Sequence, residues 1–542
     1  MIGNGTTPLR GWFLKFSVRT IGVFMAATLF GAPAAAPTFV YVANELDNTV
    51  SVIAAADNST VATIPVGTFP WGVTAAPDGR HVYVANTNDG TVSVIETAGN
   101  TVVATIPVGN GAAQVAITPD GAYAYVANAY DDTVSVIATN TNQVVATVPV
   151  GYFPIGLAIT PDGKYAYVAN NGDDTVSVIA TCSRTVVATP MVGIAPFAVA
   201  VAPFGTNVYV VNNNSNSVSV IAGGSNTIVA TIPVGSFPSA IAITPDGTRA
   251  YVANDLGATV SVIATTGNTV LATVPVGIFP LAVSITPNGT DAYIANTDDN
   301  TVSLISTASN TVTTTIPVGN SPDGVAVASA AQLLTSGSAC SGTFTGTFNG
   351  SVTVSAGQAC TFINAKVTGN VQQNGGQLIM LGTHVGGSVQ ISGAGAFAIG
   401  PGSAIGGDLQ VQNIPSSAGE SRICGASVGG NLQVQQSATA IRMGAGPLCA
   451  GNAIKGNLQN QNNSAPTSIV GNTVGGNLED QNNTAMTIVS GNTVKGNLQD
   501  QNNTATQVSD NAVSDSLQCQ HNTSITGGGN TALSKQGQCA AF

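Results

Sequence analysis

Charged side chains are scarce in this 542-residue sequence, which has 13 Lys and Arg against 25 Asp and Glu and a formal net charge of −12. Recognition of nucleic-acid phosphates needs a clustered basic surface, and the few basic residues here are scattered. We therefore expect no nucleic-acid partner. Mean hydropathy is +0.29, yet no internal stretch approaches the roughly 18 apolar residues that cross a bilayer. We expect no transmembrane segment in the mature chain.

Short motifs of catalytic and metal sites are also missing. The propeller repeats contain no Gly-x-Ser-x-Gly and no His-Glu-x-x-His, and the chain has no Cys-x-x-Cys; these motifs are typical of hydrolases, zinc proteases and zinc ribbons. General acid–base or metal chemistry usually brings several His, Asp, Glu, Lys or Arg side chains together, and the propeller repeats contain a single histidine, His81, beside a strand after a Pro-Asp-Gly turn. We expect no catalytic residue, no metal ligands, no cofactor, and a protein that is not an enzyme.

The first 36 residues have the pattern of a secretory signal peptide. Three basic residues within the first 19 precede an apolar stretch, 21–31, and small residues follow it. We therefore predict a signal peptide over 1–36 and a location outside the cell, at the cell surface or in the cell envelope.

Cysteine usage agrees with export, because paired cysteines are typical of secreted proteins. Six of the seven cysteines lie beyond residue 339, and six cysteines allow 15 pairings. Neighbour pairing is the simplest of these and joins Cys340 to Cys360, Cys424 to Cys449, and Cys519 to Cys539. Cys182 is left over as an unpaired thiol.

A repeat of 42 residues fills residues 37–328. Seven tyrosines mark it without an insertion or deletion: Tyr41, Tyr83, Tyr125, Tyr167, Tyr209, Tyr251 and Tyr293. Repeats of about 40 to 45 residues with short β-branched runs and turn residues are typical of propeller blades. The sequence predicts an all-β fold that begins with a seven-bladed β-propeller.

Each repeat contains four short apolar segments separated by turn residues, which predicts four strands per blade. The repeat region begins at the second strand of a blade and ends after a copy of the first strand, 324–328. Seven strands of each kind result, 28 in all. The first three strands and the last one must therefore share a composite blade that closes the ring.

The segments Tyr-Val-Ala-Asn, Thr-Val-Ser-Val-Ile, Ala-Thr-Ile-Pro-Val-Gly and Ile-Thr-Pro-Asp-Gly recur through this region. In these motifs the chain resembles the YVTN family of β-propeller repeats. The resemblance implies an exported, often cell-surface protein, with interaction more than catalysis as its role, and it implies no particular ligand.

Residues that break the repeat are the candidates for function, since repeated ones have a structural explanation. The position of Trp71 varies most around the ring, and in propellers its loops surround the central channel. An apolar pocket with a few polar groups is a common ligand site. The candidate ligand rim consists of Phe69, Trp71, Phe197 and Asp323; the alternative is that these residues only pack neighbouring loops.

The composition changes after a linker, 329–339, to Gly, Asn, Gln and Thr. In residues 340–542 a Val-Gly-Gly-Asn-Leu-Gln phrase recurs, and Leu458, Leu478 and Leu498 are 20 residues apart. This predicts a β-solenoid with stacked leucines inside and aligned Gln-Asn-Asn triplets. A disordered polar tail is the alternative.

The resulting interpretation is a secreted or cell-surface binding protein, non-catalytic, whose partner is another protein or a cell-surface glycan. Two other functions stay open. The first is a propeller enzyme acting at the central funnel, either a lactonase-like hydrolase or a relative of quinone- or haem-dependent oxidoreductases. The second is a structural envelope protein that self-associates through the solenoid.

Overall fold

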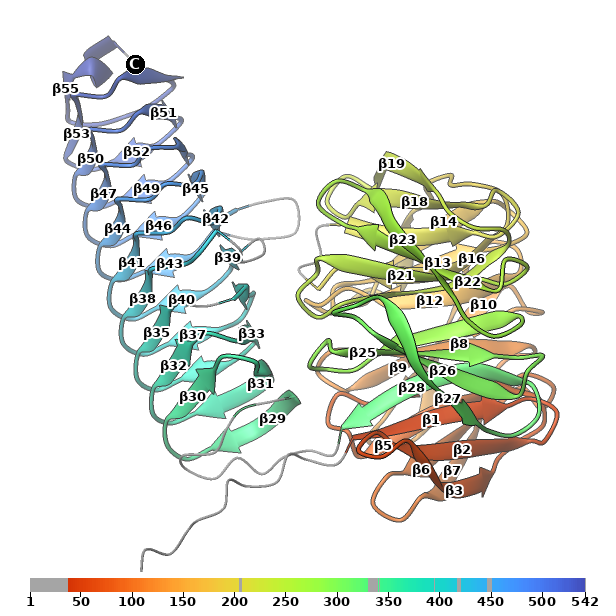
Figure 1. Cartoon of the computed structure of the whole chain (residues 1–542). Helices are drawn as coiled ribbons and strands as arrows, with labels where there is room; N and C mark the ends of the chain where they lie inside the picture. The colour runs from red at the N-terminus through yellow and green to blue at the C-terminus, as the bar shows by residue number, and fades with distance from the viewer. Residues whose placement is uncertain are drawn as a thin grey trace, which may run out of the picture. The chain divides into compact units, whose positions relative to one another are not determined.

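The computed structural model describes residues 38–203, 207–329, 340, 342–393, 395–416, 421–445 and 451–541. The signal peptide expected over 1–36, the linker beyond Ser329, and Cys449 lie outside these residues. The described chain is almost entirely β-structure, with one short 3-10 helix, η1 (Gln538–Ala541). It forms a seven-bladed propeller and a β-solenoid (Figure 1), so the predicted fold class is confirmed.

Each 42-residue repeat supplies one four-stranded antiparallel blade. In a representative blade the sheet order is β11 (Gln143–Pro149), β10 (Thr133–Ala138), β9 (Tyr123–Asn128) and β8 (Ala112–Ile117). The turn between β8 and β9 places Gly121 at a φ of 70°, which glycine adopts without steric cost. Proline ends the outer strand, where no further strand needs its missing N–H.

The strands nearest the axis of the propeller begin six times with a proline and once with an alanine. They are β4 (Pro70–Ala75), β8, β12 (Pro154–Ile159), β16 (Pro196–Val201), β20 (Pro238–Ile243), β24 (Pro280–Ile285) and β28 (Pro322–Ser329). The second strands carry the repeated tyrosine: β1 (Thr38–Asn44), β5 (His81–Asn86), β9, β13 (Tyr165–Asn170), β17 (Asn207–Asn212), β21 (Arg249–Asn254) and β25 (Asp291–Asn296).

The third strands are β2 (Thr49–Ala54), β6 (Thr91–Glu96), β10, β14 (Thr175–Ala180), β18 (Ser217–Ala222), β22 (Thr259–Ala264) and β26 (Thr301–Ser306). The outer strands are β3 (Ser59–Pro65), β7 (Thr101–Pro107), β11, β15 (Thr185–Ala188), β19 (Thr227–Pro233), β23 (Thr269–Pro275) and β27 (Thr311–Pro317).

The two ends of the propeller share one blade, as the strand count predicts. Its sheet order is β28, β1, β2, β3, and Figure 1 shows β28 beside β1. The antiparallel register pairs Thr38 with Ser329 and Tyr41 with Ala326. The ring is thus closed by hydrogen bonds between the first and last strands, which leaves no blade incomplete.

The repeated tyrosines are buried between blades, and each is at most 2% exposed. Several of their hydroxyls donate to an asparagine in the outer turn of the next blade, as Tyr41 does to Asn100 Oδ1 (2.9 Å). Tyr293 reaches Asn58 Oδ1 across the closure (3.4 Å). Five of the seven tyrosines make this bond to an asparagine, so the repeat places the same pair of partners at most of the boundaries between blades.

The asparagine that ends each second strand is structural. Asn86 donates from Nδ2 to Thr91 Oγ1 and Ser93 Oγ (both 3.0 Å), and its Oδ1 accepts from the Gly67 amide (3.1 Å). A Cβ on Gly67 would lie 2.5 Å from Asn86 Cγ, so only glycine allows this approach. These bonds join the loop before each inner strand to the loop after each second strand, on one face of the ring.

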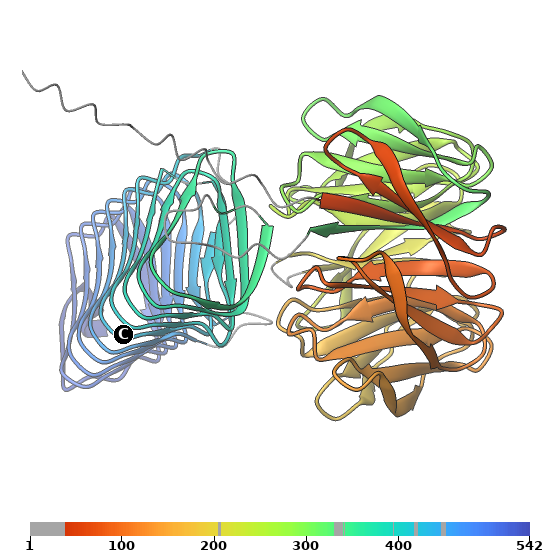
Figure 2. The same cartoon turned by 90° about the horizontal axis from the view of Figure 1, so that it is seen from below.

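The C-terminal part is a parallel β-solenoid whose coils stack along one axis, as Figure 2 shows. One of its sheets contains β30 (Val352–Ser355), β32 (Val371–Asn374), β35 (Val389–Ser392), β38 (Leu409–Gln412), β41 (Leu432–Gln435), β44 (Leu458–Gln461), β47 (Leu478–Gln481), β50 (Leu498–Gln501), β53 (Ser516–Gln520) and β55 (Ser534–Gly537).

The other sheet begins with longer strands: β29 (Gly342–Phe348), β31 (Ala359–Val367), β33 (Gln377–Leu381), β34 (His384–Val385), β36 (Phe397–Ile399), β37 (Ala404–Ile405), β39 (Ser421–Ile423), β40 (Ser427–Val428) and β42 (Ile441–Gly444). It continues through β43 (Ala453–Ile454), β45 (Thr467–Val470), β46 (Thr473–Val474), β48 (Met486–Ser490), β49 (Thr493–Val494), β51 (Ala505–Ser509), β52 (Ala512–Val513) and β54 (Ser524–Gly528).

Stacked aliphatic side chains and amide ladders hold the coils together. Leu458, Leu478 and Leu498 are in register and fully buried, as predicted. The last residue of each Gln-Asn-Asn triplet forms a buried ladder, in which Asn463 Nδ2 donates to Asn483 Oδ1 (3.1 Å) and Asn483 Nδ2 to the next coil (3.1 Å). Each amide is satisfied by the coil beside it, which makes an ordered solenoid possible despite the polar sequence.

Two of the three predicted disulfides are present among the described residues, Cys340–Cys360 and Cys519–Cys539. The partner predicted for Cys424 lies outside those residues. Each observed bridge spans 20 residues and joins adjacent coils. Cys340–Cys360 lies where the solenoid begins, and Cys519–Cys539 lies where it ends. Cys182, in the propeller, is an exposed free cysteine.

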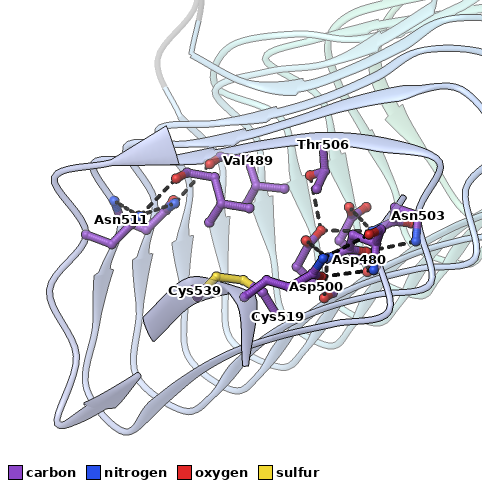
Figure 3. The surroundings of a disulfide bond; sticks show 12 residues. Asp480, Val489, Asp500, Asn503, Thr506, Asn511, Cys519 and Cys539 are labelled. Atoms are coloured by element: carbon purple, nitrogen blue, oxygen red, sulfur yellow. Dashed lines mark hydrogen bonds between the residues drawn. A yellow bond between two sulfur atoms is a disulfide. The ribbon is translucent and has the colours of Figure 1, made fainter. Parts of the chain in front are cut away.

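Near the C-terminal disulfide, two aspartates are stacked inside the solenoid (Figure 3). Asp480 and Asp500 are directly paired in the register of β47 and β50, and neither is exposed. Asn503 Nδ2 lies between them, 2.9 Å from Asp480 Oδ2 and 2.8 Å from Asp500 Oδ1. Burial is the largest cause that raises the pKa of both carboxyls, and the charge of Asp500 raises the pKa of Asp480 further.

This pair should make the solenoid less stable as pH rises. Both folded-state pKa values lie above the usual value of an unfolded aspartate, about 3.9. The contribution of the two protonated carboxyls to the free energy of unfolding is therefore complete below about pH 3.9, and it is lost as the pH rises through the folded-state pKa values. Between pH 5 and pH 9 we expect amide hydrogen exchange of residues 478–501 to accelerate more than that of the propeller. In Asp500→Asn the difference should shrink, and equal pH dependence in both proteins would contradict this account. Asn460, which holds the same position two coils earlier, shows that an amide fits there.

Candidate functional site

The inner strands of the propeller surround a cavity of about 120 Å³ on the ring axis. Each inner strand contributes the residue that follows its first position: Trp71, Ala113, Ile155, Phe197, Ser239, Leu281 and Asp323. The size is close to the roughly 150 Å³ of an apolar cavity that accepts benzene. The position that varies most in the repeat is thus the one that lines the cavity.

Three of the four residues predicted for the ligand rim meet at this cavity. The rings of Trp71 and Phe197 are 6.0 Å apart between centroids, and Asp323 is a further lining residue. Phe69 is not a lining residue; it lies in the loop before β4 with a φ of 59°. A role for these four residues in ligand binding remains a prediction.

Asp323 is the most perturbed titratable group of the propeller. It is 6% exposed, and its Oδ1 has no hydrogen-bond partner within the part of the chain that the structure describes. Burial is the main cause that raises the pKa of Asp323 to about 8, and the hydrogen bond and charge of Glu45 raise it further, while Thr297 and Ser321 oppose them. At neutral pH this carboxyl therefore holds its proton.

Glu45 lies beside Asp323 because the composite blade brings β1 next to β28. Its Oε2 accepts from Ser321 Oγ (3.0 Å), and its backbone N–H donates to the Ser321 carbonyl (2.8 Å). Glu45 is partly exposed, whereas Asp323 faces the cavity. The two carboxyls differ in environment, which is the arrangement that separates an acid from a base.

Glu45 occupies a position that elsewhere has a structural role. In four other blades the side chain after the conserved asparagine donates to a backbone carbonyl of the next inner strand, as Thr87 does to Ala112 (2.8 Å) and Thr297 to Pro322 (3.0 Å). A carboxylate cannot donate this bond. Only Glu45 and Asp255 place an acid there, and this break in the repeat is visible in the sequence, although the candidate rim predicted above does not include it.

Asp255 is the second acid at this level of the ring. It is 8% exposed, and its Oδ1 is without a partner among the described residues. Burial, and then the charge of Asp298, raise the pKa of Asp255 to about 6. Like Glu45, it is not among the residues that line the cavity.

The site places a carboxyl of raised pKa beside a second carboxyl at the edge of the cavity. General acid–base catalysis needs such a pair within reach of the reacting bond. Within the described ranges no three His, Cys, Asp or Glu side chains gather in a way that could hold a metal ion. No helix of the described residues is long and apolar enough to cross a membrane.

A protein-family model described as lactonase, seven-bladed β-propeller, matches residues 37–185 and 156–229. The match covers less than half of the chain. It includes Glu45, Trp71 and Phe197 and ends before Asp255 and Asp323. A match to a lactonase family shows that the expectation of a protein that is not an enzyme is wrong, and it points toward hydrolase chemistry. That expectation rested on the lack of clustered basic and histidine side chains, whereas the titratable groups at this cavity are carboxyls.

Several solved structures resemble the chain at low identity. Hydrazine synthase from Kuenenia stuttgartiensis is 22% identical, with 49% of this chain and 92% of that chain covered and a TM-score of 0.47. A functionally unknown protein from Desulfotomaculum acetoxidans is 19% identical (54% and 99% covered, TM-score 0.49). A candidate 6-phosphogluconolactonase from Bacteroides fragilis is 16% identical (55% and 99%, TM-score 0.48). No curated protein matches the chain significantly.

Proposed function

We propose that the propeller is a hydrolase that opens lactone rings in its central cavity, with Asp323 and Glu45 as catalytic residues. The observation that carries the proposal is the buried, unpartnered oxygen of a protonated Asp323 at an apolar cavity. A neutral carboxyl in such a place can donate a proton to a bound substrate. The match to a lactonase family model supports the choice of reaction.

In the proposed step, water attacks the lactone carbonyl carbon. The Glu45 carboxylate, which lies beside Asp323 but does not line the cavity, takes one proton of the attacking water through a bridging water. The carbon–oxygen bond of the ring then breaks, and Asp323 gives its proton to the departing ring oxygen. The product is a hydroxy acid that contains the water oxygen. The proton held by Glu45 returns to Asp323 along the hydrogen bond between the two carboxyls, so the pair is restored without another reactant.

The cavity walls support this chemistry in two ways. Trp71, Phe197 and Leu281 provide apolar surface for the body of the substrate. The same walls keep water away from Asp323, which maintains its raised pKa and strengthens its hydrogen bonds to a ligand.

The pH dependence of hydrolysis tests the assignment of the acid. Because Asp323 must be protonated to act, turnover of δ-valerolactone by the full chain should fall above an apparent pKa of about 8. The measurement is initial rate by pH-stat, after subtraction of the uncatalysed rate, between pH 6 and pH 10. Turnover that rises through pH 9 in parallel with hydroxide would contradict an acid at Asp323, and no turnover at any pH would contradict the function.

We further propose that the chain is exported, with domain limits of 37–328 for the propeller and 340–542 for the solenoid. Disulfides such as Cys519–Cys539 support export, because they persist in oxidising compartments. We also propose that the chain belongs to the YVTN repeat family. A separate proposal is that it self-associates through the solenoid, which concentration-dependent light scattering would test.

A further inference from the structure

The basic side chains of the propeller avoid the face where the cavity opens. Arg80 and Lys164 directly precede second strands, Arg249 begins one, and Arg184 precedes an outer strand. Second strands start at the end of a blade opposite to the mouth, because they run antiparallel to the inner strands whose first residues line it. These four are all the Lys and Arg residues between positions 38 and 329, so no basic side chain belongs to the mouth.

Acidic side chains, in contrast, surround the mouth. Besides Glu45, Asp255 and Asp323, the loops after the second strands carry an aspartate at the same repeat position in five blades: Asp47, Asp89, Asp131, Asp173 and Asp299. Hydrogen bonds from the neighbouring loop lower the pKa of several of them; Asn320 does so for Asp47, and Thr68 for Asp89. Asp47, Asp89 and Asp131, whose pKa values are lowered in this way, are ionised at neutral pH, so the mouth carries negative charge.

Large apolar side chains stand exposed between the acids. They occupy two repeat positions in loops that are joined by backbone hydrogen bonds around the mouth. Those with the highest exposure are Leu46 (67%), Tyr130 (63%), Tyr152 (60%), Leu256 (60%), Ile194 (56%) and Ile278 (56%). We call these six residues the apolar collar. Exposed apolar groups gathered around a cavity are typical of a binding surface.

We propose that the substrate is a lactone without negative charge whose ring carries an alkyl chain, with the ring in the cavity and the chain on the apolar collar. This inference rests on the proposed hydrolysis and specifies its substrate class. The same features exclude phosphorylated sugar lactones. Phosphate recognition relies on Arg, Lys or free backbone N–H groups, and an anion at the mouth would meet the carboxylates of Asp47, Asp89 and Asp131.

The cavity dimensions agree with this division of the substrate. About 120 Å³ is room for one small ring and no more, so a side chain of several carbons must leave through the mouth. There it meets the collar. The two tyrosines of the collar both pack against Phe153, with ring centroids 5.9 Å away for Tyr130 and 6.4 Å away for Tyr152. Each methylene that is buried on the collar contributes favourable transfer free energy to binding. Lactones with longer alkyl chains should therefore bind more tightly.

The test compares three probes with the full chain: δ-dodecalactone, δ-valerolactone, and 6-phosphoglucono-δ-lactone. We expect kcat/KM for δ-dodecalactone to exceed that for δ-valerolactone about tenfold or more, since several methylenes reach the collar. The phosphorylated probe should be at least about 100-fold poorer than δ-dodecalactone, and added salt should narrow that gap by screening. Comparable kcat/KM for the phosphorylated probe would overturn the inference and leave the hydrolase function intact.

Substitutions in the collar test its role in binding independently of the roles proposed for Asp323 and Glu45. Ile278→Ser and Tyr152→Ser should each lower kcat/KM for δ-dodecalactone roughly threefold to tenfold through KM and leave δ-valerolactone unchanged. Val229→Ser is the matched control, since Val229 is also 56% exposed but lies in outer strand β19. Equal loss for both lactones, or the same loss in Val229→Ser, would overturn the role of the collar.

Binding without turnover is a distinguishable outcome. Trp71 is one of two tryptophans, and the other, Trp12, lies in the expected signal peptide, so Trp71 fluorescence of the chain without residues 1–36 reports on the cavity. Quenching by δ-dodecalactone but not by the phosphorylated probe, with no hydrolysis of either, would contradict the proposed hydrolysis. It would still support an uncharged alkyl lactone as the ligand. Absence of both quenching and hydrolysis would overturn both proposals.

Discussion

Asp323→Asn is expected to lower kcat for lactone hydrolysis at pH 7 by roughly 10²- to 10⁴-fold, the usual contribution of a general acid. Asparagine has nearly the shape of aspartic acid, so the cavity should keep its form, but an amide cannot give a proton to the departing ring oxygen. The measurement is steady-state hydrolysis of δ-dodecalactone and δ-valerolactone, with Trp71 quenching to confirm that the substrate still binds.

Glu45→Gln should cause a loss of similar size, and the double variant should lose little more than either single variant, because the two carboxyls act as a unit. Asp57→Asn is the matched control, since Asp57 is an exposed aspartate in the turn between β2 and β3. A double variant whose losses multiply would mean that the residues act independently. Full activity in Asp323→Asn would remove this carboxyl from the mechanism.

Deletion of residues 39–53 is expected to unfold the propeller at ordinary temperatures. It removes most of β1 and β2 and leaves β28 without a partner in the closing sheet. Tyr41, Val42, Val52 and other fully buried side chains go with it, each worth about 1.5–3 kcal/mol by burial, against a typical domain stability of about 5–15 kcal/mol. Circular dichroism melting against the chain lacking only residues 1–36 provides the comparison. Matching melting curves would contradict closure of the ring through β1 and β28.

The role of the repeated residues could be understood from the sequence because each has the same local structural role in successive blades. The glycine at the repeat position of Gly67 allows the asparagine at the position of Asn86 to approach closely. The tyrosine at the position of Tyr41 meets a partner at a fixed distance along the sequence. These demands fix strand number and ring closure. In the solenoid the same reasoning applies to Leu458 and Asn463, whose neighbours recur one coil later.

The pair of carboxyls that we propose as catalytic could not be found in this way, because its properties arise from ring closure. Glu45 and Asp323 stand at opposite ends of the propeller sequence and meet only when β1 joins β28. The sequence shows that Asp323 departs from the repeat, but its burial depends on the six other inner strands. Our prediction for this position was therefore a rim residue, while the structure places it inside the cavity.

The register of the closing blade also determines how the propeller responds to force. Thr38, where the propeller begins, pairs with Ser329, where it ends, so tension between these two points pulls apart the terminal pair of the ladder first. The bonds between β1 and β28 then carry the load one after another, as in the opening of a zipper, and do not share it as in shear. Once they have separated, the ring has lost its closure. The seam that assembles the proposed active site is thus its mechanical weak point, and stretching the chain would disable hydrolysis before any other blade is disturbed.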